Sequence, residues 1–112
     1  MKTKIIFNRT DLRVGIFQDK LIIVEKIEKT CDACPSQWEG RTSDDKPIYV
    51  RYRYGALEIC LGKKIGGNTE DAILFGDTIF DKQLGHDMDG VINYSQLKKA
   101  TTGVIAWPEY DK

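Results

Sequence analysis

The sequence has no excess of charge, few cysteines and no long apolar run, and each absence excludes a class of protein. Its 17 basic and 17 acidic residues cancel among 112, whereas a dedicated double-stranded DNA-binding domain needs a basic surface. No apolar run approaches the roughly 18 residues that span a bilayer, so we expect no membrane partner. Three cysteines are an odd number, which indicates thiols or metal ligands in a reducing compartment rather than a disulfide framework.

The sequence also has little that would support catalysis. It contains one histidine, His86, and no P-loop, no dinucleotide-binding glycine pattern and no Ser-His-Asp arrangement. His86 lies in a polar segment typical of loops, where an isolated histidine is seldom a general base. We therefore predict a protein that is not an enzyme and that uses no cofactor.

The N-terminus begins with basic residues but has only three consecutive apolar residues, Ile5 to Phe7. That run is too short for the apolar region of a secretory signal. We expect a cytoplasmic protein that folds as a single domain over residues 1–112, because domains of about 100–150 residues are the commonest.

Short β-forming segments separated by turns occupy the first part of the chain. Residues 2–8 predict a first strand that ends at a turn over residues 8–11, and residues 18–20 predict a tight hairpin connection. The four apolar residues that begin at Leu21 favour a buried strand over residues 21–29, although the same segment is also compatible with a helix.

The region from Pro35 to Leu61 is the most strongly β-forming part of the chain. A polar turn at residues 43–46 and a second reversal at Gly55 separate three apolar or aromatic segments, and two successive hairpins predict a meander. A Gly-Gly-Asn loop over residues 63–69 follows. One further strand is expected within residues 71–80, interrupted at residues 76–77, before a polar, turn-rich segment.

A short helix is predicted after Asn93. Asn93 and Gln96 have the spacing of a capping box, and Ile92 and Leu97 occupy the two positions of a hydrophobic staple. Gly103 is a candidate for the C′ position, ahead of a final strand-like segment.

These elements predict an α+β fold, an antiparallel meander of about five to seven strands with one short C-terminal helix across a face or an end. The predicted core consists of Ile6, Val14, Ile22, Val24, Ile48, Val50, Tyr52, Leu57, Ile59, Leu61, Ile73 and Leu97.

Side-chain alternation gives the strand after Pro47 two different faces. The face predicted to point into the core carries Ile48, Val50, Tyr52 and Tyr54. The other carries two arginines beside an aromatic ring, a combination that binds phosphates or carboxylates and stacks on bases. The alternative is an ordinary exposed face on which the arginines pair with nearby carboxylates. Trp38 on the neighbouring strand would extend this arginine face, so the candidate binding residues are Trp38, Tyr49, Arg51 and Arg53.

Two segments have partial metal-site patterns. Cys31 and Cys34 form a CxxC pair, which we interpret as structural thiols. The alternatives are a zinc site completed by Cys60 and His86, and a redox pair. Residues 85–96 imitate a calcium-binding EF-hand loop through Asp87 and Asp89. Gly85 and Gln96 replace its first and last ligands, however, so an aspartate-rich turn leading into a capped helix is the alternative.

The strings CDACPSQWEG (residues 31–40) and PIYVRYRYG (residues 47–55) resemble a group of small, functionally uncharacterised bacterial and phage proteins. These share the pattern PSQW(E/D)G…Y(I/V)RYR(Y/H)G, and the resemblance covers roughly the central third of the chain. It implies a bacterial or phage origin. Because the group has no established activity, it implies no catalytic or binding residue.

Together these observations predict a non-catalytic, cytoplasmic protein-interaction module of bacterial or phage origin, of which a phage inhibitor of a host system would be a special case. One alternative is a module that binds single-stranded nucleic acid or another anion through the arginine face. The other is an interaction module stabilised by zinc.

Overall fold

The computed structural model describes residues 21–32 and 36–109. The predicted first strand, the turn after it and the hairpin at residues 18–20 lie outside these residues, as do Ile6 and Val14. In chain order the elements are β2 (Ile22–Cys31), β3 (Ser36–Thr42), β4 (Pro47–Arg53), β5 (Ala56–Leu61), α1 (Thr69–Phe75), β6 (Asp77–Gln83), α2 (Tyr94–Ala100) and β7 (Ile105–Ala106).

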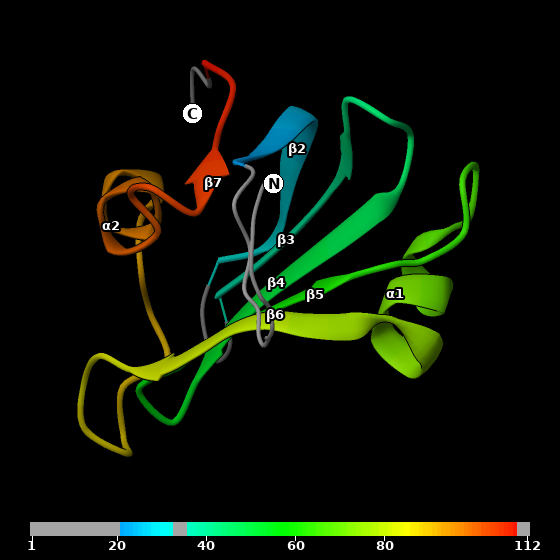
Figure 1. The fold of residues 1–112 in the computed structure, drawn as a ribbon. Helices are drawn as coiled ribbons and strands as arrows, with labels where there is room; N and C mark the ends of the chain where they lie inside the picture. The colour runs from blue at the N-terminus through cyan, green and yellow to red at the C-terminus, as the bar shows by residue number, and fades with distance from the viewer. Residues whose placement is uncertain (1–20, 33–35, 110–112) are drawn as a thin grey trace, which may run out of the picture.

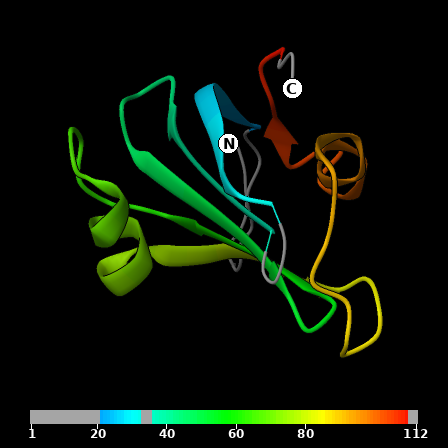
Figure 2. The ribbon, with the colours of Figure 1, turned by 180° about the vertical axis from the view of Figure 1, so that it is seen from behind.

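The strands form one sheet in the order β6-β5-β4-β3-β2-β7. Neighbours from β2 to β6 pair antiparallel, and the short β7 pairs parallel with β2. The sheet curls strongly, and the two helices lie at separate places around it (Figures 1 and 2). The predicted α+β class, mainly an antiparallel meander, is confirmed. None of the helices in the described ranges is long and apolar enough to span a membrane.

Both predicted reversals of the central region are confirmed. At the first, the amide of Thr42 donates to the carbonyl of Lys46 at 2.9 Å, and Asp45 adopts a φ of 64°. At the second, Tyr54 and Gly55 have φ values of 57° and 75°. Positive φ at both central residues is the signature of a type I′ turn, whose twist matches that of the strands that it joins.

The core lies on one face of the sheet. The strand register places Val50 opposite both Trp38 and Ile59, so these side chains share that face. Ile22 and Leu61 are partly buried against it. The buried residues of the core cluster are Val24, Trp38, Ile48, Val50, Tyr52, Leu57, Ile59, Ile92, Tyr94, Leu97 and Ile105. Tyr54, predicted to point inward, instead lies in the turn with its side chain exposed.

The strand predicted over residues 21–29 is present as β2, but the prediction that it is buried is wrong. Val24 is the one buried residue of this strand, while Ile23 is exposed and Ile27 partly buried. An antiparallel strand commonly has only one face against the core, so a run of apolar residues in it is divided between the two faces.

The prediction of one interrupted strand over residues 71–80 is also wrong. The segment forms helix α1 and then strand β6, with Gly76 between them. Asn68 caps α1, since its side chain accepts from the amide of Asp71 while the Asp71 carboxylate accepts from the amide of Asn68. Ile73, predicted to be in the core, lies on this helix and is 47% exposed.

The predicted C-terminal helix is confirmed as α2, including the capping box between Asn93 and Gln96. Ile92 and Leu97 are both buried, as a hydrophobic staple requires. Gly103 has a positive φ of 86° but lies two residues after the C-cap Thr101, so it is not at C′.

The two helices lie on opposite faces of the sheet. Leu97 of α2 belongs to the core cluster that contains Trp38. On α1, the hydroxyl of Thr69 donates to the carboxylate of Glu39 at 3.0 Å. Trp38 and Glu39 are adjacent in β3 and therefore point to opposite faces. Helix α2 thus covers the core, whereas α1 contacts the polar face.

Candidate binding surfaces

The structure separates Trp38 from the other three candidate binding residues. Trp38 is 0% exposed and faces the core, whereas Arg51 and Tyr49 lie on the polar face. The ammonium group of Lys29 lies 5.0 Å from the centre of the indole ring. The prediction that Trp38 extends the arginine face is therefore wrong.

The polar face is electrically mixed. The guanidinium of Arg51 forms an ion pair with Glu58, its cross-strand neighbour on β5. The amide nitrogen of Gln37 donates to the Tyr49 hydroxyl at 2.8 Å, and burial raises the pKa of Tyr49. Pairing of this kind is typical of an exposed antiparallel face. It leaves Arg51 without a free positive charge.

Arg53 differs from Arg51. Among the described residues it forms no ion pair with a carboxylate, and its guanidinium carbon lies 5.1 Å from the centre of the Tyr54 ring. Arg53 is the last residue of β4, and Tyr54 follows it in the β4–β5 turn. This turn lies beside the loop that follows β6 (Figure 1). Of the two candidate arginines, Arg53 is therefore the one that no carboxylate of the described residues neutralises.

The aspartate-rich segment after β6 is attached to that hairpin. The hydroxyl of Tyr52 donates to the Asp89 carboxylate at 2.6 Å, and the amide of Gly55 donates to the Asp89 carbonyl at 2.7 Å. The hydrogen bond from Tyr52 lowers the pKa of Asp89, while burial and Asp89 together raise the pKa of Tyr52 to about 12. Asp89 therefore holds the loop in place, as in the aspartate-rich turn that was the alternative to a calcium site.

The alternative zinc site is not assembled from the described ligands. Cys60 lies opposite Tyr49 and Thr78, whereas the carbonyl of His86 contacts Gly55, at the other end of β5. The five strand residues that follow Gly55, ending at Cys60, span about 16 Å. Two ligand atoms of one zinc ion each lie roughly 2 Å from it, so Cys60 and His86 are too far apart to share an ion. Cys34 is outside the described residues, which contain no group of three or more His, Cys, Asp or Glu side chains that could hold a metal. Burial also raises the pKa of Cys60, opposite to what a reactive thiolate needs.

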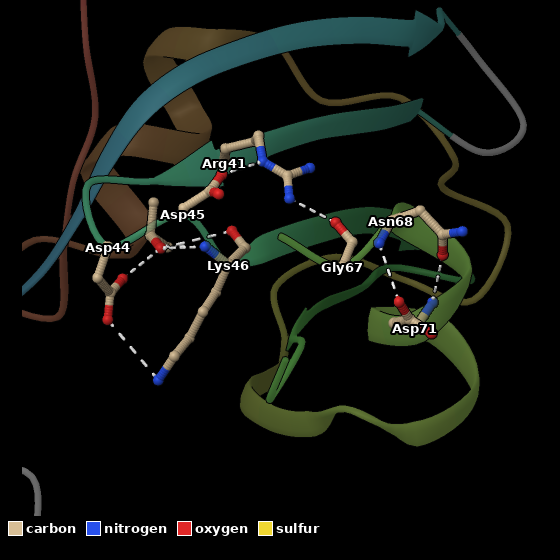
Figure 3. Close-up of polar contacts among 8 residues, drawn as sticks. Arg41, Asp44, Asp45, Lys46, Gly67, Asn68 and Asp71 are labelled. Atoms are coloured by element: carbon tan, nitrogen blue, oxygen red, sulfur yellow. Dashed lines mark hydrogen bonds and ion pairs between the residues drawn. The ribbon is translucent and has the colours of Figure 1, made fainter. Parts of the chain in front are cut away.

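A network of polar contacts fixes the start of α1 against the β3–β4 turn (Figure 3). Arg41 donates to the carboxylate of Asp45 at 2.7 Å and also to the carbonyl of Gly67 in the loop before the helix. In the same loop the amide of Gly66 donates to the carbonyl of Asp45 at 2.7 Å. The position of α1 is thus set at its N-terminal end.

The other end of α1 exposes large apolar side chains. Ala72 is the buried residue of this helix. The side chains of the next three residues are exposed to solvent, and those of Leu74 and Phe75 are 67% and 70% exposed. The sequence prediction missed this surface because it assigned Ile73 and its neighbours to a strand. The cap formed by Asn68 and Asp71 was the available signal for a helix.

Comparisons with known protein families, curated proteins and solved structures gave no match to this chain.

Proposed function

We propose that this protein is a non-catalytic interaction module that binds another protein through the apolar end of α1. The observation that supports this is the exposure of three consecutive large apolar residues, Ile73, Leu74 and Phe75. Contiguous exposed apolar side chains are typical of interaction sites, because their removal from water contributes to association. A bacterial or phage origin and a cytoplasmic location are part of the proposal and rest on the sequence alone.

The local structure fits a presented surface. Helix α1 has seven residues, too few to be stable alone. The capping box and the contacts of Arg41 and Thr69 hold its first turn, while its last turn remains uncovered. A rigidly attached helix loses little conformational freedom on binding, which favours affinity.

The test is affinity capture from bacterial lysates, including phage-infected cells, with immobilised wild type and the double variant Leu74→Asp/Phe75→Asp. The control is Lys99→Asp, which changes the net charge by the same amount on the exposed side of α2. We expect at least one protein that wild type and control retain and that the double variant loses by about tenfold, because charged groups replace apolar contacts. Captured proteins that do not differ between the double variant and the wild type contradict the proposal. A wild-type dimer that the double variant dissociates would instead identify the partner as a second copy.

A further inference from the structure

Two hollows meet at the tip of the β4–β5 hairpin, and Arg53 and Tyr54 line both. One has a volume of about 190 Å³ and is completed by Asp87, Met88, Asp89 and Gly90. The other, of about 230 Å³, is completed by Arg51, Ala56, Glu58, Asp81 and Gln83. We call the first hollow and its lining the Tyr54 surface. The β4–β5 turn, which contributes Tyr54, lies at the opposite end of β4 and β5 from α1 (Figure 1).

Tyr54 has an unfavourable backbone conformation, and its side chain is not buried in a way that would offset the cost. Its φ of 57° lies in the left-handed region, which tyrosine seldom adopts and which asparagine or glycine would occupy at lower cost. The side chain is nevertheless 64% exposed, and Met88 across the hollow is 84% exposed. Strained backbone and exposed aromatic or methionine side chains are both typical of binding sites.

The walls of the hollow are fixed by hydrogen bonds on both sides. The side chain of Gln83 donates to the carbonyls of Tyr54 and Gly85 at 2.8 and 2.7 Å. The amide of Met88 donates to Nδ1 of His86 at 3.2 Å, within the loop that Asp89 ties to the hairpin. The surface is therefore preorganised, which lowers the entropy cost of binding.

The charges around the two hollows indicate the sign of the partner. Two arginines and four carboxylates line them, which leaves two negative charges in excess. Arg51 is paired with Glu58, and the Asp89 carboxylate accepts from Tyr52. Asp87 and Asp81 form no ion pair among the described residues. Arg53 is the one cation in this lining without an ion pair to the described part of the chain, and Asp81, Asp87 and Asp89 outnumber it. The surface therefore repels a nucleic acid backbone and attracts a cation.

The size and the lining indicate one side chain. A volume of about 190 Å³ is below the roughly 300 Å³ at which small-molecule pockets begin. Tyr54 and Met88 supply an apolar wall, and Asp87 supplies a carboxylate. Lysine and arginine combine an aliphatic stem with a charged end, which matches such a wall.

We propose that the Tyr54 surface binds a lysine or arginine side chain of a partner protein, with the stem against Tyr54 and Met88 and the cationic group at Asp87. This binding site is separate from the apolar end of α1 and does not depend on it. A protein with both would engage a partner at two ends of the sheet.

The test uses a dye-labelled glycine–serine peptide that carries leucine between two lysines, and a matched peptide with glutamates in place of the lysines. Fluorescence anisotropy at low salt should show binding of the lysine peptide by wild type. Asp87→Lys should weaken that binding by about tenfold or more and should bind the glutamate peptide better than wild type does. Tyr54→Asn should weaken binding without lowering the melting temperature, because asparagine relieves the strain in the turn.

The control is Glu70→Lys, which changes the net charge by the same amount as Asp87→Lys at an exposed position outside both proposed surfaces, and it should bind the lysine peptide as wild type does. The α1 proposal is tested by the capture experiment alone, so its failure is distinguished from failure of this one. Equal binding of both peptides, no binding at low salt, or no effect of Asp87→Lys would overturn the inference. Tighter binding of single-stranded oligothymidine than of the lysine peptide would overturn it in favour of a nucleic acid partner.

Discussion

At the scale of single residues, Trp38 and Tyr54 have environments opposite to those predicted from the sequence. Trp38, expected on the exposed arginine face, is buried because its register partner Val50 points into the core. Tyr54, expected in the core, leaves the pleat of β4 because it adopts a left-handed turn conformation. Alternation of side chains holds within a strand, and both errors arise from assigning a residue to a face before the pairing and the end of the strand are known.

The hydrogen bond between Tyr52 and Asp89 predicts a pH dependence of stability. The pKa of Tyr52 is raised from 10.0 to about 12, so its contribution is fully present below pH 10 and lost as the pH rises toward 12. The pKa of Asp89 is lowered from 3.8, so its contribution is present above pH 3.8 and lost as the pH falls through the lowered value. Urea unfolding of wild type should therefore show stability falling at both extremes.

Tyr52→Phe should flatten this profile at both ends and lower the stability at neutral pH by about 1 kcal/mol, the usual contribution of one hydrogen bond. Asp89→Asn should remove the acid-side dependence that this pair contributes. Profiles of the same shape for wild type and Tyr52→Phe would show that the pair does not link stability to pH.

At the scale of the element, α1 and α2 have the same length and the same kind of N-terminal cap but different roles. Each begins at an asparagine whose side chain accepts from the amide of the third helical residue. Helix α2 buries Tyr94 and Leu97, whereas α1 buries Ala72 alone. The stability of α2 therefore depends on the core, and that of α1 depends on its cap and its first turn.

Asn68→Ala should loosen α1 without unfolding the sheet. Loss of an N-cap costs about 1 kcal/mol, so hydrogen exchange at the amides of residues 73–76 should become about fivefold faster. The amides of β4 serve as the internal control and should keep their protection. A matching loss of protection in β4 would show that α1 unfolds together with the sheet, against this expectation.

At the scale of the whole molecule, the curled sheet separates the two helices (Figures 1 and 2). One face carries the core and contacts α2, and the other carries paired charges and contacts α1. Truncation of an apolar side chain should lower the free energy of unfolding when that side chain lies on the first face. The same truncation on the second face should have little effect. The two surfaces that we propose for binding lie at the two ends of β4 and β5.

The two helices offer a matched pair of leucines to test this division. Leu97→Ala should lower the free energy of unfolding by about 3 kcal/mol, because it leaves a cavity at a fully buried position. Leu74→Ala should change it by no more than about 0.5 kcal/mol, because that side chain is already exposed to water. Equal losses in chemical denaturation would show that the exposed end of α1 contributes to the core.

The sequence by itself determined the features that depend on neighbours along the chain. The turns at residues 43–46 and at Gly55, the capping box of α2 and the succession of central strands all follow from local backbone preferences and short-range hydrogen bonds. The cap at Asn68 belongs to the same class of signal, although the apolar residues after it resembled a strand.

The tertiary structure alone decided the features that depend on contacts between distant segments. Pairing of β3 with β4 buries Trp38, and the attachment of α1 to the polar face exposes Phe75. The hydrogen bond from Tyr52 to Asp89, 37 positions apart, brings the loop after β6 to the hairpin tip. The strand register holds Cys60 away from that loop and from His86. The physical reason is that local preferences fix the conformation of a segment, whereas burial and register depend on which other segment packs against it.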